Sequence, residues 1–167
     1  MEIGNFKISG HSTKRNWAVY ILVAKPKIKN KKTIIYVGKV GDNRAGCNPV
    51  ISRVGNHFSY NKIHSQIRNA IPDTENYDYE YFYCHFDAYD TEKELWKKGR
   101  EKTNELEREL NRIVQKNINE KSSEFLNPYS GKYVSNAIKK YRSELINNEE
   151  IAMLEKLCAK ALIDNNT

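Results

Sequence analysis

The chain of 167 residues lacks any apolar run long enough to span a membrane, because a transmembrane helix needs about 20 consecutive apolar residues. Its first residues also lack the apolar stretch of a signal peptide. Cysteine is scarce: Cys47, Cys84 and Cys158 are widely spaced, and no two of them have the Cys-x-x-Cys spacing. The sequence therefore indicates neither a disulfide framework nor a zinc knuckle. We expect a cytoplasmic protein with no membrane partner.

Acidic residues are too few to balance the basic ones. The chain has 28 Lys and Arg against 21 Asp and Glu, which gives a formal net charge of +7. Such an excess suggests a polyanionic partner, most often nucleic acid. Hydrophobic residues make up 39% of the chain, which argues against a disordered protein. The length fits one compact domain with a real core.

Three segments have the pattern of strands. The continuous apolar run at 17–24 and the β-branched run at 33–40 are separated by a short basic loop, which makes a hairpin the default pairing. An alternating, aromatic-rich segment at 77–86 predicts a third strand. Its alternating tyrosines are interpreted as ordinary strand residues: Tyr77, Tyr79, Tyr81 and Tyr83.

The helical spacing of apolar residues predicts the elements between and after the strands. Either one bent helix or two begins at Pro49, with Asn48 as the cap. A long helix is expected at 92–118, capped by Asp90 or Thr91. The strands and these helices therefore alternate along the first two thirds of the chain.

After a turn that contains proline and glycine, two amphipathic helices are expected, the second capped by Asn147 or Asn148. The order of elements predicts an α+β fold, with a small, three-stranded, mainly antiparallel sheet flanked by helices. We expect a single domain over 1–167, with a core at 17–120 and a helical C-terminal extension at 128–165.

Polar and aromatic residues follow the second strand at helical spacing. Six of them would share one helix face if that helix were continuous: Arg53, His57, Tyr60, Asn61, His64 and Arg68. A basic and aromatic rim of this kind suits a phosphate backbone, and a solvated helix face is the alternative. We predict nucleic-acid contacts at Tyr60, His64 and Arg68.

Five sequence elements, in this order along the chain, resemble the motifs of the GIY-YIG nucleases. They are Ala18-Val19-Tyr20, Tyr36-Val37-Gly38-Lys39, Arg53-x-x-x-His57, Leu106-Glu107-x-x-Leu110 and Asn119. The resemblance covers roughly residues 17–120. The first motif lacks the Gly-Ile of the family, and the chain is longer than usual between Tyr20 and Tyr36 and between Tyr36 and Arg53.

This resemblance implies a GIY-YIG-like fold and metal-dependent hydrolysis of phosphodiester bonds. Glu107 would hold a divalent cation, Mg²⁺ or another of its kind, and Arg53 would bind a non-bridging phosphate oxygen. Tyr20, assisted by Tyr36, would orient or deprotonate the attacking water. His57 would position that water or shuttle a proton.

Two more residues, Lys39 and Asn119, would support the site in the same reading. The motifs leave rivals for two of the assigned residues. Glu105 and Glu109 are rivals for the metal-binding glutamate, and Arg44 is a rival for the catalytic arginine.

The partner that the resemblance implies is double-stranded DNA. Size and insertions suit a sequence-specific restriction-type enzyme, with Arg44 and Lys132 as candidates for DNA contact. Cleavage of both strands would call for a homodimer or for two sequential nicks. The alternatives are a non-catalytic nucleic-acid-binding module, a repair or phage-type nuclease, and RNA as substrate. A PD-(D/E)xK site is absent in its standard form, because no lysine has Asp or Glu two positions before it.

Overall fold

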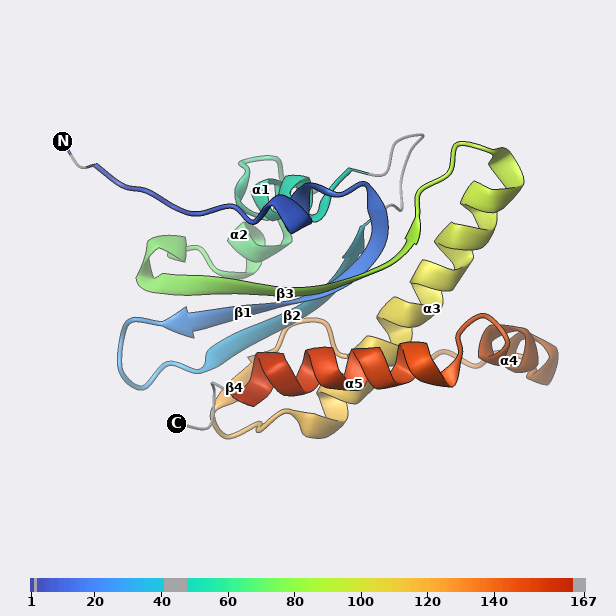
Figure 1. The fold of residues 1–167 in the computed structure, drawn as a ribbon. Coiled ribbons are helices and arrows are strands. Elements are labelled where there is room, and N and C mark those ends of the chain that lie inside the picture. The colour runs from blue at the N-terminus through green and yellow to red at the C-terminus, as the bar shows by residue number, and fades with distance from the viewer. Residues whose placement is uncertain (2, 41–47, 164–167) are drawn as a thin grey trace.

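The computed structural model describes residues 1, 3–40 and 48–163. Its centre is a four-stranded sheet in the order β3-β1-β2-β4, with helices on both faces (Figure 1). The strands are β1 (Asn16–Pro26), β2 (Thr33–Val40), β3 (Tyr77–Ala88) and β4 (Ser123–Phe125). β1 pairs antiparallel with both β2 and β3, which confirms the predicted hairpin, and β4 runs parallel to β2. The α+β class is confirmed.

The prediction of a three-stranded sheet is wrong, because β4 adds a fourth strand at the outer edge of β2. β4 is too short for its alternation to be read from the sequence. Its pairing partners lie far away in the chain, with Thr33 opposite Ser123 and Ile35 opposite Phe125. The sheet edge therefore forms through long-range pairing and not through a local pattern.

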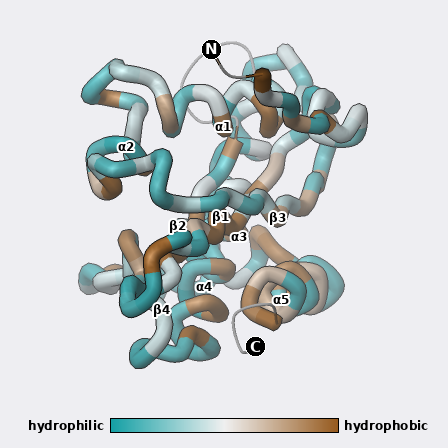
Figure 2. Tube along the Cα trace, turned by 90° about the vertical axis from the view of Figure 1, so that its left-hand side faces the viewer, coloured by the Kyte–Doolittle hydropathy of each residue, from teal (hydrophilic) through white to brown (hydrophobic). Residues whose placement is uncertain are grey.

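The helices form two layers, α1 (Val50–Phe58) and α2 (Gln66–Ala70) on one side of the sheet and the later helices on the other. These later helices are α3 (Lys93–Asn117), α4 (Asn136–Ser143) and α5 (Asn148–Ile163). Figure 2 shows the same separation from the side, with α1 and α2 above the strands and α4 and α5 below them. Two short 3-10 helices complete the fold, η1 (Gly10–Thr13) and η2 (Thr74–Asn76).

The segment after Pro49 contains two helices and not one. Between α1 and α2 the chain turns, and the buried Ser65 hydroxyl contacts the backbone carbonyl oxygens of Ser59 and Asn61. These contacts compete with helical hydrogen bonds in the way that serine side chains commonly do. The predicted stripe from residue 53 to residue 68 is therefore not one continuous helix face.

Two of the predicted helix caps are wrong by a residue or two. Pro49, and not Asn48, occupies the N-cap position of α1. The Glu92 side chain caps α3 by accepting from the backbone N–H groups of Glu94 and Leu95. Asp90 instead accepts from the Glu92 backbone N–H at 2.8 Å. The turn before α3 is therefore one step longer than the sequence suggested.

Helix α5 is capped by Asn147, which is one of the two residues predicted for this position; the other, Asn148, is the first residue of the helix. Its Oδ1 accepts from the Glu150 backbone N–H at 2.9 Å, and the Glu150 carboxylate accepts from the Asn147 N–H at 3.0 Å. This reciprocal pair is a capping box, which satisfies two of the backbone groups that a helix start leaves open.

The face of the sheet turned toward α3 and α5 carries the main apolar core. Val19, Ile21 and Val23 of β1 belong to one buried cluster with Leu110 of α3 and Leu154 of α5. Residues of the predicted C-terminal extension (128–165) are thus buried in the same apolar cluster as residues of the predicted 17–120 segment. The opposite face has two smaller clusters, which include the alternate residues of β1, Leu22 in one and Tyr20 in the other.

Two further expectations concern cysteines and membranes. Cys84 and Cys158 are free and buried, and Cys47 lies outside the described residues.

Over the part of the chain that the structure describes, every helix is too short or too polar to cross a bilayer.

Candidate active site

Tyr20 lies at the centre of the face that α1 covers, and it is fully buried. The strand register places it opposite Gly38 of β2. A Cβ atom at position 38 would lie 2.4 Å from both Cζ and Oη of Tyr20. Position 38 therefore has to be glycine if the Tyr20 ring is to lie across β2, which gives a steric reason for the glycine after Tyr36-Val37.

His57 of α1 meets Tyr20 at the strongest polar contact of this face. The Tyr20 hydroxyl and His57 Nε2 are 2.6 Å apart, and both side chains are fully buried. Burial, together with the charge of Arg53, lowers the pKa of His57 to about 4. Burial also raises the pKa of Tyr20 well above its usual range. Both groups are therefore neutral at neutral pH and share one hydrogen bond.

Arg53 lies one turn before His57 on α1 and is half-buried. Its charge opposes the effect of burial on the pKa of Tyr20 and of Tyr36. Burial acts to lower the pKa of Arg53 itself, but Tyr20, Tyr36 and Glu107 raise it overall. The guanidinium, the two phenols and the Glu107 carboxylate therefore belong to one electrostatic neighbourhood.

Tyr36 of β2 completes the aromatic part of this group. Its ring centroid lies 5.1 Å from that of His57 and 6.3 Å from that of Tyr20. Burial raises its pKa, and Arg53 acts in the opposite direction. The structure thus brings together the four residues that the sequence assigned on the first two strands and the first helix.

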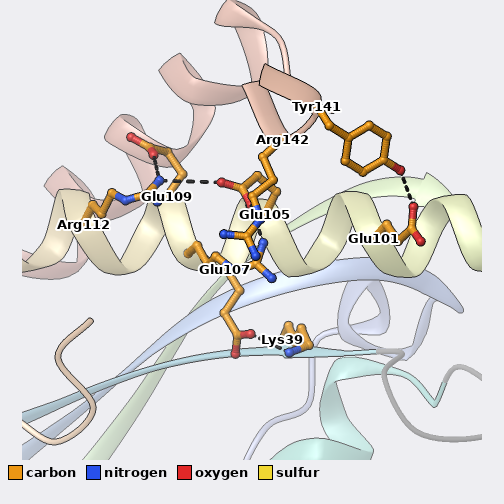
Figure 3. Close-up of polar contacts among 9 residues, drawn as sticks. Lys39, Glu101, Glu105, Glu107, Glu109, Arg112, Tyr141 and Arg142 are labelled. Carbon is orange, nitrogen blue, oxygen red and sulfur yellow. Dashed lines mark hydrogen bonds and ion pairs between the residues drawn. The ribbon is translucent and has the colours of Figure 1, made fainter. Parts of the chain in front are cut away.

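Glu107 joins the group from α3 through Lys39 of β2. Lys39 Nζ and Glu107 Oε2 are 2.5 Å apart, and the two side chains are 16% and 25% exposed. Figure 3 shows Glu107 pointing from α3 toward the sheet, where it meets Lys39. The carboxylate is therefore accessible to a ligand but already neutralised by a cation.

The two rival glutamates of the same helix point elsewhere. In Figure 3 they lie on the α4 side of α3, away from Lys39. The Glu105 side chain is 6% exposed and pairs with Arg108 and Arg142. Glu109 pairs with Arg112 at 2.6 Å. Among these three glutamates, Glu107 is the one that pairs with a residue of β2. It approaches from α3, on the other side of the sheet from α1, and its charge acts on the pKa of Tyr20, Tyr36 and Arg53.

The expected supporting residue Asn119 is exposed and folds back on its own turn. Its Oδ1 accepts from the Lys121 backbone N–H at 3.1 Å. Asn127 instead holds β2: its Nδ2 donates to Val37 O at 2.7 Å, and its Oδ1 accepts from Val37 N–H at 3.1 Å. Sequence reasoning missed Asn127 because its partner is 90 positions away, and the only local signal was its place in an Asn-Pro turn.

Tyr81 of β3 is a second residue that the sequence analysis passed over. Its ring centroid lies 5.6 Å from that of Tyr20 and 6.3 Å from that of His57. Its hydroxyl oxygen is buried and has no hydrogen-bond partner within the described residues. Alternation along β3 indicated which face Tyr81 occupies, but not that its hydroxyl would be enclosed.

The predicted nucleic-acid contacts lie outside this cluster. Tyr60 is 87% exposed, and the guanidinium of Arg68 lies 4.2 Å from its ring centroid. His64 is exposed in the turn between α1 and α2. Lys132 is exposed at the rim of a cavity of about 750 Å³ beside α3 and α4. Arg44, the rival of Arg53, lies outside the described residues.

Magnesium would have one protein carboxylate available here. Within the described residues, no group of three or more His, Cys, Asp or Glu side chains converges to hold a metal ion. Mg²⁺ commonly binds through one or two carboxylates and completes its shell with water and phosphate oxygens. A single Glu107 therefore fits this ion better than one that needs an all-protein cage.

Comparisons with family models, with curated proteins and with solved structures found no match for this chain.

Proposed function

We propose that this protein is a metal-dependent DNA endonuclease that hydrolyses phosphodiester bonds, related in design to the GIY-YIG nucleases. The observation that carries the proposal is the buried Tyr20–His57 hydrogen bond of 2.6 Å with Arg53 one helical turn away. His57 and Arg53 of α1 thus both lie beside the Tyr20 hydroxyl of β1, on the elements where the resemblance expects them.

In the proposed reaction Tyr20 orients the attacking water. In this proposal its hydroxyl donates to His57 Nε2, 2.6 Å away, and this leaves its oxygen lone pairs to accept from that water. His57 is neutral at neutral pH because burial depresses its pKa, so it can accept the phenol hydrogen bond. The pair then acts as a fixed acceptor for the water, and positioning of this kind lowers the barrier to attack.

Arg53 would stabilise the negative charge that grows on the phosphate. A guanidinium offers several N–H donors in one plane, which suits phosphate oxygens. Glu107 would hold the divalent cation, which supplies charge stabilisation for the leaving oxygen when it is bound. Lys39 holds the Glu107 carboxylate at β2 and competes with the cation for it.

Double-stranded DNA is the proposed substrate, and a sequence-specific restriction role is the proposed biology. The net charge of +7 supports a polyanionic partner. Exposed Tyr60 and half-buried Arg68 offer an aromatic face and a cation close to α1. Exposed apolar side chains on α4, Ile138 and Tyr141, are the surface that we propose for a homodimer.

The decisive experiment incubates supercoiled plasmid and Mg²⁺ with wild type and with Glu107→Gln. The variant keeps size and hydrogen bonding but loses the charge that a cation needs, so cleavage should fall by at least about 100-fold. Glu109→Gln is the matched control, because this residue lies on the same helix and pairs with Arg112 instead. Equal cleavage by Glu107→Gln and wild type would remove Glu107 as the metal ligand.

The second candidate function is a nucleic-acid-binding module without catalysis. One observation favours it: Glu107 is ion-paired with Lys39, as a purely structural carboxylate would be. This reading predicts DNA binding that weakens steeply with salt, with no cleavage in Mg²⁺ or Mn²⁺. Binding titrations at several salt concentrations, run beside the plasmid assay, separate the two functions.

A further inference from the structure

Three polar atoms of the candidate site are buried and have no hydrogen-bond partner among the residues described: Tyr81 Oη, His57 Nδ1 and Arg53 Nε. Buried polar groups in native proteins are nearly always paired. Each group that stays unpaired costs about 1–3 kcal/mol. Five other such atoms lie on His85, Trp96, Arg100 and Asn111. The three at the candidate site are neighbours around Tyr20, so that one arrangement can account for them together.

The hydrogen bonding of Tyr20 decides which nitrogen of His57 carries the proton. The Tyr20 hydroxyl proton needs an acceptor, and Arg53 beside it offers only donors. Within the described residues, His57 Nε2 at 2.6 Å is the hydrogen-bond partner of this hydroxyl that can accept from it. A neutral imidazole has one N–H and one acceptor nitrogen, so the proton of His57 lies on Nδ1.

That Nδ1 proton requires an acceptor in turn, and the unmatched hydroxyl of the neighbouring Tyr81 is a candidate for it. Tyr81 lies on β3, the strand next to the one that carries Tyr20, and its ring centroid is 6.3 Å from that of His57. The Tyr81 hydroxyl and His57 Nδ1 are both buried and both unmatched within the described part of the chain. A single water can join two such groups at little cost, since it makes a hydrogen bond to each.

We propose that Tyr81 is a positioning residue: its hydroxyl oxygen accepts a hydrogen bond from one buried water, which in turn accepts from the Nδ1–H of His57. This chain holds His57 in the tautomer whose Nε2 accepts the hydrogen bond of Tyr20. The chain of hydrogen bonds then runs from β3 through α1 to β1. Tyr81 takes the place of the third group that orients the base in many nucleophile–base pairs. Its kinetic consequence rests on the proposed nuclease function, but the hydrogen-bond chain can be observed in the resting protein.

The first test measures the tautomer directly by ¹⁵N NMR of the four histidine side chains. In wild type, the His57 signals should show the proton on Nδ1, and Tyr81→Phe should shift them toward a mixture of tautomers. Tyr83→Phe is the matched control, because Tyr83 lies on the same strand but its hydroxyl contacts the exposed His11 at 3.3 Å. A His57 proton on Nε2 in wild type, or His57 shifts unchanged in Tyr81→Phe, would overturn the proposal.

The second test is kinetic and uses the same two variants. Removing a group that orients another functional side chain commonly costs about 10- to 100-fold, so kcat should fall by this factor in Tyr81→Phe with KM unchanged. Tyr83→Phe should keep the wild-type kcat. Unchanged kcat in Tyr81→Phe, with wild type active, contradicts the proposal. Absence of cleavage by wild type would instead contradict the nuclease function, and the NMR result would then decide the tautomer proposal alone.

Discussion

On one side of β1, Val19 and Ile21 pack against α3 and α5, whereas on the other side Tyr20 lies against His57 of α1. The first face buries aliphatic side chains and cysteines in one large cluster. The second encloses phenol, imidazole and guanidinium groups, several of them without partners among the described residues. Successive residues of β1 thus belong alternately to the apolar core and to the polar group of the candidate site.

The difference between the two faces concerns what burial does to the free energy of unfolding. Apolar area removed from water stabilises the fold by about 25 cal/mol per Å². Unpaired buried polar groups destabilise it by about 1–3 kcal/mol each. Protein sites that do chemistry often sacrifice stability in this way. The α3/α5 face therefore supplies stability that offsets the cost of unpaired polar atoms on the α1 face.

The largest effect should come from weakening the apolar face. Leu154 of α5 is fully buried in the main cluster, and Leu154→Ala should lower the free energy of unfolding by about 2–5 kcal/mol. Urea denaturation measures this loss. The cleavage rate per folded molecule should stay unchanged, because Leu154 belongs to the apolar cluster and is not one of the proposed site residues. A small loss of stability would show that this face is not the main core.

The next effect is a loss of stability in acid that comes from the α1 face. The pKa of His57 is about 4 in the folded protein and near 6.5 when unfolded. Between these two values only the unfolded chain binds the proton. The contribution of His57 to the free energy of unfolding is therefore fully present above pH 6.5 and is lost as the pH falls toward 4. Between pH 7 and pH 5 the loss should be about 2 kcal/mol.

Urea denaturation at several pH values, with His57→Phe as the comparison, isolates this contribution. The variant cannot titrate at position 57, so its stability should depend less on pH over this window. Burial lowers the pKa of His85 too, and some dependence should persist in the variant. Identical slopes in both proteins would contradict the buried, neutral state of His57.

A smaller effect is expected from Gly38→Ala, which forces the Tyr20 ring out of its place. The new methyl group would meet the ring at 2.4 Å, and overpacking of this kind costs about 1–3 kcal/mol. Cleavage should fall as well, because the hydroxyl of Tyr20 moves away from His57. Both quantities can be measured on the same preparation by denaturation and plasmid cleavage.

Gly55→Ala is the matched control for this substitution. Gly55 lies within α1, and a Cβ atom there would meet nothing within 4 Å. Alanine is the better helix former by about 1 kcal/mol, so this variant should gain stability and keep its activity. A loss of stability at position 55 would show that helix α1 is packed more tightly than the structure indicates.

Tyr20→Phe should cost about as much stability as Gly38→Ala, but its effect on cleavage should be large. Loss of the hydroxyl leaves buried His57 Nε2 without its partner, which costs about 1–3 kcal/mol, and the ring stays in place. Cleavage should fall by about 100-fold or more, since the oxygen that orients the water is gone. An active Tyr20→Phe variant would transfer the role to another residue.

Much of the fold follows from local patterns in the chain. The strong apolar runs predicted β1 and β2 closely, and alternation predicted β3. Tyr36, Arg53 and His57 come together with Tyr20 because a hairpin and the helix after it need little long-range information. Asn127 and β4 escaped prediction because their partners on β2 are about 90 residues away.

Other errors came from competing local interactions. The break between α1 and α2 depends on the Ser65 hydroxyl, whose partners only the folded chain reveals. The sequence offered Asp90 and Thr91 as caps of α3, but the Glu92 carboxylate is the group that reaches the backbone N–H groups of Glu94 and Leu95. For Tyr81, the period of the strand gives its face, but the burial of its oxygen depends on α1 above it.

The two hydrogen bonds that join the Asn127 side chain to the Val37 backbone, here called the clamp, have a consequence for the order in which parts of the site form during synthesis. The β1–β2 hairpin can pair soon after it leaves the ribosome, since folding tends to begin with the N-terminal part of a chain. The carboxylate of Glu107 and the clamp at the edge of β2 emerge much later. If cleavage is confirmed, an unfinished chain would carry the tyrosines and the arginine without the group that holds the metal. Synthesis itself would then delay the activity until the molecule is nearly complete.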